Sequence, residues 1–410
     1  MSIEPVVIIG VGMQGRTSLE PTIQELIVHS DELWGSSRLL AEWEELPQPR
    51  VVLDKQLTAT LCRLEKRSPD RKVVILASGD PGFYGIAATV LQVLPAEEIR
   101  IYPEVSSLQA AFAKVCIPWS EAALTSAHAR PLAEIIGLAR RFPKLGILTD
   151  PQQTPGMIAE RLLAAGIADC RAIVLENLGQ ASEKMIDSRL SALPDRQFAP
   201  LNVLLLVHDP GWKPAPACQP RPDSAYQHKK GLITKSDVRL ASILRLGICE
   251  TDLIWDIGAG SGAVSIEMAE MAWRGQVFAI EKDAGCLDCL RQNLARFGTV
   301  NVEIVAGAAP QALHQLPAPG AVFIGGSSGK LVGILNHIQQ AARPGCRVVA
   351  NFAILENLMQ AHAWMQSHGW QPALTEASFS YGSDLAGGTR LVPANPVFIL
   401  SGTVCHKEGS

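Results

Sequence analysis

Short apolar runs alternate with segments of helical periodicity along the whole chain. These runs are Val6–Ile9, Val73–Ala77, Leu145–Thr149, Ala172–Leu175, Val203–Val207, Leu253–Trp255, Val277–Ile280, Val302–Val305, Ala321–Ile324, Arg347–Ala350 and Pro396–Ser401. Their continuous rather than alternating apolar character is typical of strands buried on both faces of a parallel sheet. The proline that starts the last run predicts an edge strand or a late hairpin. The pattern therefore predicts the α/β fold class for both halves.

A proline-rich segment separates these halves. Residues His208–Lys230 carry prolines at positions 210, 214, 216, 220 and 222 and show no apolar periodicity, as expected of an extended linker. A chain of 410 residues is also too long for one ordinary hydrophobic core. We therefore expect two domains, residues 1–208 and 229–410, joined by a linker at residues 209–228.

Composition excludes several classes of function. The net charge is −4 and no basic run occurs, which argues against binding of a nucleic-acid backbone. No apolar run approaches the roughly 18 residues of a membrane span, and the first residues lack a basic targeting region, so we expect a cytoplasmic protein without membrane contact. The nine cysteines are scattered, and the C-x-x-C at Cys286 and Cys289 lacks a second ligand pair, so we expect reduced thiols and no metal.

The sequence "DIGAGSG" forms a glycine-rich turn between an apolar strand and a helix. Gly258, Gly260 and Gly262 let the backbone approach a ligand and point free N–H groups toward it. Asp256, before the first glycine, would repel a pyrophosphate but favour a sulfonium. Glu281 ends the next strand, where a carboxylate can accept hydrogen bonds from ribose hydroxyls. The pair favours S-adenosylmethionine, while a dinucleotide site and a turn without a ligand stay open.

Further motifs around this turn are more specific. The segments "GLITKSDVR", "AGAAPQAL", "VFIGGSSGK", "ANFAILEN" and "NPVFIL" resemble the decarboxylating precorrin methyltransferase domain of cobalamin biosynthesis over residues 225–402. That resemblance implies a Rossmann-like class I methyltransferase fold. It implies cofactor contacts from Thr234, Gly258, Gly262, Glu281 and Ala308, and tetrapyrrole contacts from Gly325, Gly326 and Ser327. Because Ala308 stands where the family is expected to carry aspartate, only its backbone is available to the adenine.

The amino-terminal half carries a second glycine cluster, "GVGMQG", which fits a dinucleotide fingerprint and keeps a nicotinamide oxidoreductase open. Pro21 interrupts the helix that should follow and predicts a helix capped by Thr22, which weakens that interpretation. With "LASGDPGFYG", "PEVSSLQAAFA", "TSAHARP", "ILTDPQQTP" and "VLENLG", residues 3–208 resemble the two-lobed tetrapyrrole methylases of class III. The resemblance implies cofactor-site loops at Gly10, Gly12, Asp80, Ser107, Ala127 and Thr149. His128 is either a base or a packing residue.

A tetrapyrrole carries many carboxylates, so arginine and lysine should line its cavity. The candidates are Lys229, Lys230, Lys235, Arg239 and Arg390, each of which is otherwise a solvated surface cation. The reaction also needs a general acid that protonates carbon after decarboxylation. Tyr381 and Asp384 in "FSYGSDLAGG" are the weak candidates for that role.

Together the two resemblances imply one bifunctional enzyme. The amino-terminal domain would methylate meso position C-5 of a precorrin-6B-type tetrapyrrole, using S-adenosylmethionine. The carboxy-terminal domain would methylate C-15 and decarboxylate the C-12 acetate, with its own cofactor, giving precorrin-8. The family implies a dimer or tetramer of identical chains. The cobalt-containing form of the same substrate and a cofactor-binding scaffold without turnover stay open as alternatives.

Overall fold

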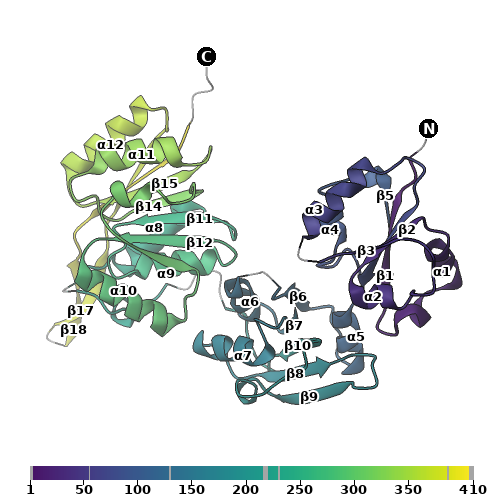
Figure 1. Cartoon of the computed structure of the whole chain (residues 1–410). Helices are drawn as coiled ribbons and strands as arrows, with labels where there is room; N and C mark the ends of the chain where they lie inside the picture. Colours follow the sequence, from purple (N-terminus) through teal and green to yellow (C-terminus); the bar gives the residue numbers. More distant parts are fainter. Residues whose placement is uncertain are drawn as a thin grey trace. The chain divides into compact units, whose positions relative to one another are not determined.

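The computed structural model describes residues 3–54, 56–128, 131–215, 220–229, 231–385 and 387–405 (Figure 1). The chain forms two compact units. The first unit comprises Met1–Pro131, Phe142–Leu163 and Ala168–Lys213, and the second comprises Leu132–Arg141, Ala164–Ile167 and Pro214–Ser410. Helix α6 (Leu132–Ala139) therefore packs with the second unit, although it precedes the proline-rich segment in the sequence.

The first unit contains two sheets. In one, β1 (Val6–Val11), β2 (Glu32–Gly35), β3 (Arg50–Val52), β4 (Val73–Ser78) and β5 (Ile99–Tyr102) are all parallel, in the order β3-β2-β4-β1-β5. The other has the order β6-β7-β10-β8-β9, with strands β6 (Ala122–Ser126), β7 (Lys144–Leu148), β8 (Arg171–Glu176), β9 (Lys184–Arg189) and β10 (Asn202–Val207). The helices of this unit are α1 (Pro21–Val28), α2 (Ser37–Ala41), α3 (Leu57–Leu61), α4 (Ala87–Val90), α5 (Ser107–Lys114) and α7 (Pro155–Ala164).

Two local predictions for the first unit are wrong. Strand β10 is antiparallel to both β7 and β8, whereas its continuous apolar run predicted a parallel strand. Residues 203–206 are nevertheless all buried, because a central strand covered on both faces is apolar whichever way it runs. Helix α1 begins at Pro21 with Glu20 as its N-cap, not at Thr22. Proline suits the first helical position because its missing N–H would have no partner within the helix.

The second unit is built on one sheet with the order β13-β12-β11-β14-β15-β19-β16. Its strands are β11 (Leu253–Ile257), β12 (Gln276–Glu281), β13 (Val302–Ala306), β14 (Ala321–Ile324), β15 (Arg347–Phe352), β16 (Ala373–Ala377) and β19 (Val397–Thr403). Strands β11 to β15 are parallel to their neighbours, and β19 is antiparallel to β15 and β16. The prediction that the last apolar run is an edge strand or hairpin is wrong. Strand β19 begins after Pro396, so no ladder N–H is missing and both its edges are paired.

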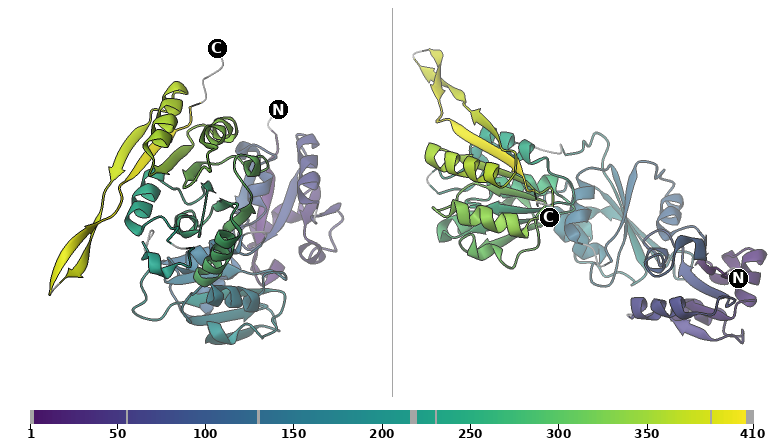
Figure 2. Two further views of the ribbon diagram at one scale, coloured as in Figure 1. Left: turned by 90° about the vertical axis from the view of Figure 1, so that its left-hand side faces the viewer. Right: turned by 90° about the horizontal axis from the view of Figure 1, so that it is seen from above.

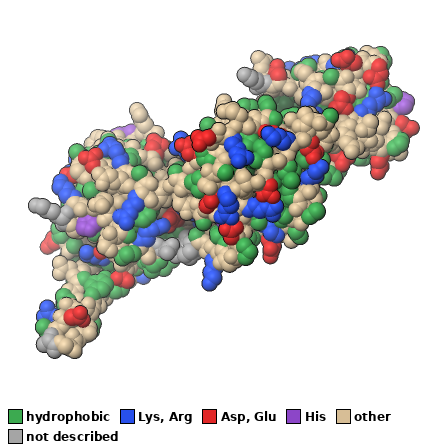
Figure 3. All heavy atoms as spheres, turned by 90° about the horizontal axis from the view of Figure 1, so that it is seen from below, with side chains coloured by type: hydrophobic (Ala, Val, Ile, Leu, Met, Phe, Trp, Pro, Cys, Tyr) green, Lys and Arg blue, Asp and Glu red, His purple; other side chains and the backbone are tan. Residues whose placement is uncertain are grey.

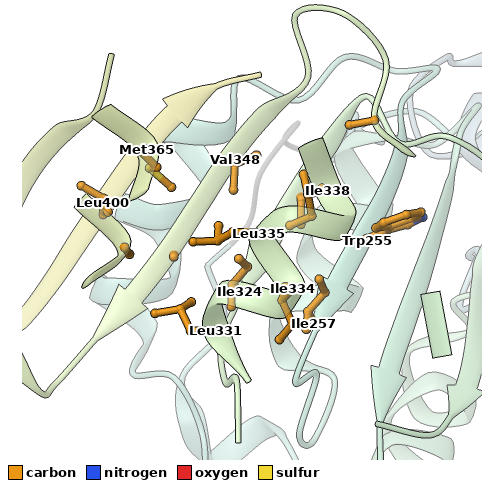
Figure 4. Packing of buried hydrophobic residues seen from close by; sticks show 14 of the residues in the cluster. Trp255, Ile257, Ile324, Leu331, Ile334, Leu335, Ile338, Val348, Met365 and Leu400 are labelled. Atoms are coloured by element: carbon orange, nitrogen blue, oxygen red, sulfur yellow. The ribbon is translucent and has the colours of Figure 1, made fainter. Parts of the chain in front are cut away.

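Helices α8 (Ser236–Leu246), α9 (Ala263–Met271), α10 (Ala284–Phe297), α11 (Leu331–Ala341) and α12 (Leu355–Ser367) complete the second unit. Leu331, Ile334, Leu335 and Ile338 recur at helical spacing, and Figure 4 shows α11 packing them beside the sheet residues Ile257, Ile324 and Val348. Each fully buried side chain of this size contributes about 1.5–3 kcal/mol to stability. This packing holds the carboxyl ends of β11 and β14 rigidly in place.

The antiparallel hairpin of β17 (Ser380–Leu385) and β18 (Gly388–Pro393) projects from the sheet of the second unit (Figure 2). Every residue of β18 is exposed, which explains why the sequence shows no apolar run at this strand. The face in Figure 3 carries acidic and basic side chains intermixed over its surface. Within the described parts of the chain, no helix is long and apolar enough to cross a membrane.

Candidate active site

A cavity of about 780 Å³ opens in the second unit where the parallel strands end. Its walls come from the loops that follow β11, β12, β13, β14 and β15, and from residues 231–235. Open parallel sheets bind ligands at this edge because the strand ends leave a crevice there. The cavity is therefore the candidate site of the second unit.

The glycine turn predicted from "DIGAGSG" forms one wall of this cavity. Gly258 has a φ of +78°, and a Cβ there would lie 2.7 Å from the backbone nitrogen of Gly326. Only glycine therefore lets the loops after β11 and β14 approach so closely. The N–H groups of Gly258 and Ala259 both donate to the carbonyl of Ile280, which ties the turn to β12. Gly260 also lines the cavity; Gly262 does not, and it starts α9 as its N-cap.

Glu281 lies at the end of β12 with its carboxylate held by three backbone N–H groups. Oε2 accepts from Gly260 at 2.9 Å, and Oε1 accepts from Lys282 at 2.7 Å and from Asp283 at 2.8 Å. The carboxylate is thus fixed at the cavity wall with lone pairs left over for a ligand. Thr234 and Ala308 line the same cavity. The structure therefore brings Glu281, Thr234, Ala308 and the glycine turn together, as a cofactor site requires.

Asp256, which the sequence paired with Glu281, lies elsewhere. Its side chain is fully buried and does not line the cavity. It accepts a hydrogen bond from the hydroxyl of Ser265 on α9, and burial raises the pKa of the carboxyl to about 7. The expected approach of this carboxylate to a sulfonium is not what the structure shows, because the side chain points toward α9.

The candidate cations are distributed unevenly. Lys235 lines the cavity and lies 3.1 Å from Asp223, and Lys282 and Lys330, which the sequence analysis did not single out, line it too. Gly325, Gly326 and Ser327 of the loop after β14 face the same space. Lys229 pairs with Asp283 at 3.1 Å, and Lys230 lies outside the described residues. Arg390 and Arg239 do not line the cavity, and Arg239 is fully buried.

Of the two candidate general acids, Tyr381 and Asp384, only Tyr381 lies at the cavity. Tyr381 lines the cavity, and its hydroxyl donates to Asp237 Oδ2 at 2.8 Å. That hydrogen bond raises the pKa of the phenol to about 12, so Tyr381 carries its proton at neutral pH. Asp384 is exposed further along β17 and is not part of the cavity wall.

The first unit holds a second cavity, of about 400 Å³. Gly12, Asp80, Ser107 and Thr149, four of the residues that the sequence resemblance places at a cofactor cleft, line it. Ser107 is held there at the start of α5 by a capping box, in which Ser106 and Gln109 each accept a backbone N–H of the other. The cavity is therefore bounded by elements that are locally rigid.

Gly10 and Ala127 lie behind the wall of this cavity rather than in it. A Cβ on Gly10 would lie 2.2 Å from the carbonyl oxygen of Gly79, so glycine is required where β1 and β4 end side by side. Ala127 is fully buried, and its carbonyl accepts a hydrogen bond from the side chain of Gln153. Both residues shape the cavity without facing it.

Further polar groups of this cavity were not predicted. Arg38 on α2 lines it and donates to the hydroxyl of Ser78 at 2.7 Å. Asn202 also lines it and accepts from the hydroxyl of Thr149 at 2.6 Å. His128 lines it with a side chain that is 75% exposed, 3.9 Å from Asp150. No recognisable motif surrounds Arg38 or Asn202, so only the fold could reveal them.

Among the residues that the structure describes, no group of three or more histidine, cysteine, aspartate and glutamate side chains is placed to hold a metal ion.

Comparison with known proteins gives a consistent result for both halves. Residues 5–194 match the family described as Tetrapyrrole (Corrin/Porphyrin) Methylases, and residues 224–403 match the Precorrin methyltransferase domain. The chain is 30% identical over 404 residues to the Precorrin-6Y C(5,15)-methyltransferase [decarboxylating] of Sinorhizobium sp, covering 95% of this chain and 94% of that protein.

Two further proteins are each similar to less than half of the chain. The Cobalt-precorrin-6B C(15)-methyltransferase (decarboxylating) of Salmonella typhimurium is 34% identical over 177 residues, covering 43% of this chain and 90% of that protein. A crystal structure of precorrin-6y C5,15-methyltransferase from Geobacter metallireducens GS-15 has 32% identity and a TM-score of 0.44, covering 46% of this chain and all of that one.

Proposed function

This chain belongs to the decarboxylating precorrin-6Y C(5,15)-methyltransferase family, and we propose that it methylates C-5 and C-15 of a precorrin-6B-type tetrapyrrole and decarboxylates the C-12 acetate. The observation that carries this proposal is the presence of two separate cavities, one in each unit. Two methyl groups then go to two different carbons at two different sites. The metal-free tetrapyrrole is the proposed substrate, and its cobalt form is the alternative.

The cofactor proposed for both sites is S-adenosylmethionine, one molecule in each unit. When bound it would supply its methyl group to the nucleophilic meso carbon, and S-adenosylhomocysteine would leave. In the second unit the oriented carboxylate of Glu281 accepts from the ribose, and the glycine turn admits the cofactor close to the backbone. In the first unit Gly12, Asp80, Ser107 and Thr149 hold it. These residues contribute orientation and exclusion of water rather than a covalent step.

The second unit performs the decarboxylation and the C-15 methylation. Residues 224–403 match the Precorrin methyltransferase domain, and the Salmonella relative, whose aligned region covers 43% of this chain, carries both activities in its name; together these support the assignment. The C-5 methylation then belongs to the first unit. We propose residues 1–208 and 229–410 as the two functional domains, with residues 209–228 as the linker.

Lysines at the second cavity bind the carboxylates of the tetrapyrrole. Lys235, Lys282 and Lys330 reach this cavity, and the loop at Gly325, Gly326 and Ser327 offers backbone contacts. Loss of carbon dioxide leaves an electron pair on the acetate carbon, which the macrocycle delocalises until a proton arrives. Tyr381 is the proposed source of that proton, because it lines the cavity, and solvent would then reprotonate the phenolate.

Product analysis tests the function directly. The purified full chain is incubated with metal-free precorrin-6B and S-adenosylmethionine, and the product is weighed by mass spectrometry. We expect a gain of two methyl groups and the loss of one carbon dioxide. An unchanged mass, with the same substrate batch consumed by a known active enzyme, would refute the metal-free assignment. A parallel incubation with the cobalt form then tests the alternative.

We also propose that identical chains assemble into a dimer or tetramer. Family resemblance is the support for this part of the proposal. Light scattering on the protein as it elutes from a sizing column measures the mass of the assembly, and a mass of one chain would refute it.

A further inference from the structure

Arg239 on α8 is fully buried, and its guanidinium contacts one short segment of the chain. Nη1 donates to the carbonyl of Thr234 at 2.6 Å, and Nη2 donates to the carbonyl of Arg221 at 2.6 Å. Nε lies 2.8 Å from Oε1 of Glu267 on α9. The guanidinium also lies 5.1 Å from the ring centroid of Tyr226. One buried cation therefore joins two carbonyls that are separated by a stretch of loop.

Residues 221–229 and 231–235, which we term the cap segment, lead into one wall of the second cavity. Its last residues, Gly231, Leu232, Ile233, Thr234 and Lys235, line that cavity directly. The two carbonyls that Arg239 binds lie at the two ends of the segment. The position of the cap segment over the cavity thus depends on the guanidinium.

Glu267 also binds the cap segment, through hydrogen bonds to two of its residues. Its Oε1 accepts from the hydroxyl of Tyr226 at 3.0 Å and from the backbone N–H of Arg221 at 3.3 Å. Only 1% of the glutamate is exposed, and among the described residues its Oε2 has no hydrogen-bond partner. The negative charge of Glu267 is therefore buried, and only one of its two carboxylate oxygens accepts hydrogen bonds from the part of the chain that the structure describes.

A buried ion pair of this kind is a poor source of stability. Taking two charges out of water costs several kcal/mol per ion, and well-packed apolar side chains of similar volume often stabilise a fold as well or better. What apolar side chains cannot do is donate hydrogen bonds to two carbonyls in a fixed relative position. The contacts of Arg239 therefore indicate a role in position rather than in stability.

Asp223 connects this pair to a cation of the cavity. Its Oδ1 lies 3.4 Å from Arg239 Nη1, and its Oδ2 lies 3.1 Å from Lys235 Nζ. Lys235 lines the cavity at the end of the cap segment, where α8 begins. Fixing the guanidinium thus also restrains a lysine that faces the cavity.

We propose that Arg239 and Glu267 form a buried clamp that positions the cap segment for the chemistry of the second unit. They are positioning residues, because neither lines the cavity. The clamp sets where Thr234 meets the cofactor and where Lys235 meets a substrate carboxylate. This inference rests on the proposed function of the second unit.

Two variants of the full chain separate position from stability. Arg239→Met removes the donors and leaves Glu267 buried and unpaired, so it lowers both stability and activity. The double variant Arg239→Met with Glu267→Gln removes both charges and keeps an acceptor for the Tyr226 hydroxyl and the Arg221 N–H, so its unfolding temperature should return close to that of the wild type. Arg245→Met, on the exposed face of the same helix, is the matched control and should behave as wild type.

The C-5 methylation in the first unit is the internal reference for activity. In the double variant we expect C-15 methylation and decarboxylation to fall about 100-fold, as a misplacement of about 1 Å can cause, while C-5 methylation is retained. Arg239→Lys should recover part of the loss, since lysine restores the charge but not the two-carbonyl geometry. Recovery of both stability and second-unit turnover in the double variant would overturn the clamp.

Trypsin provides a measurement that does not depend on turnover. Cleavage after Lys229 and Lys235 reports whether the cap segment is held, and S-adenosylhomocysteine should slow it in the wild type. In the double variant cleavage should be faster at the same unfolding temperature. Equal cleavage in both proteins would also overturn the clamp. If the wild type fails to turn over the tetrapyrrole, the proposed function fails, and this digestion still tests the clamp.

Discussion

Replacing Glu281 by glutamine changes one atom of the carboxylate that three backbone N–H groups hold beside the second cavity. The N–H groups of Lys282 and Asp283 both need an acceptor at Oε1, so the amide oxygen of glutamine should take that place. The amide nitrogen then stands where Oε2 stood, facing the N–H of Gly260. A donor would face a donor at that point, and the ribose would lose its charged acceptor.

The size of the effect follows from the bonds that are lost. A hydrogen bond to a charged group contributes about 1.5–3 kcal/mol. Loss of one such bond to the ribose should therefore weaken binding at the second site by roughly 10- to 100-fold. The lost bond to Gly260 loosens the turn itself and adds to that weakening.

Titration calorimetry of the full chain with S-adenosylhomocysteine measures this effect. We expect two binding events in the wild type, and in Glu281→Gln one unchanged event with a second that is weakened. The product should then gain only the C-5 methyl group and keep its acetate carboxyl. Two unchanged binding events, or carbon dioxide release at the wild-type rate, would refute the assignment of Glu281 to the cofactor of the second unit.

Three further predictions concern other positions. Asp80→Ala should impair C-5 methylation and leave carbon dioxide release intact, because Asp80 lines only the first cavity; a loss of decarboxylation would contradict the separation of the sites. Gly10→Ala should lower the free energy of unfolding by about 1–3 kcal/mol, measured by urea denaturation, because its Cβ would lie 2.2 Å from the carbonyl oxygen of Gly79. Burial raises the pKa of Asp256 to about 7, so the folded chain holds a proton that the unfolded chain releases near pH 4, and stability falls as the pH rises between these values. Asp256→Asn should remove that part of the pH dependence, and an unchanged difference in unfolding temperature between pH 5 and pH 7.5 would contradict the assignment.

Local sequence pattern was sufficient for most of the strands that are buried on both faces. Ala321–Ile324 matches β14 at both ends, and Leu253–Trp255 lies within β11. The pattern missed β16 and the hairpin of β17 and β18, whose residues are largely exposed, and in the first unit it missed β2, β3, β5, β6 and β9. Of these, β2 and β6 are largely buried, but polar residues such as Glu32, Thr125 and Ser126 shorten their apolar runs. A strand that is buried on both faces has a continuous apolar sequence, whereas an exposed strand carries polar residues and cannot be recognised in this way.

Sequence pattern also could not predict which side chains at the site reach the cavity. Asp256 and Glu281 both stand at strand ends, yet only Glu281 reaches the cavity. Arg239 occurs in a motif rich in cations, and its burial follows from contacts with Thr234, Arg221 and Glu267. Direction and burial depend on neighbours from other elements, which a single motif does not contain.

The sequence by itself determined the α/β class, the family resemblance and the glycine turn at Gly258, because each of these depends on residues that are close along the chain. The tertiary structure alone decided that β10 runs antiparallel, that Lys282 and Lys330 face the cavity, and that Arg239 does not. These features depend on which distant segments pack together, since packing sets the direction of each strand and the surroundings of each charge.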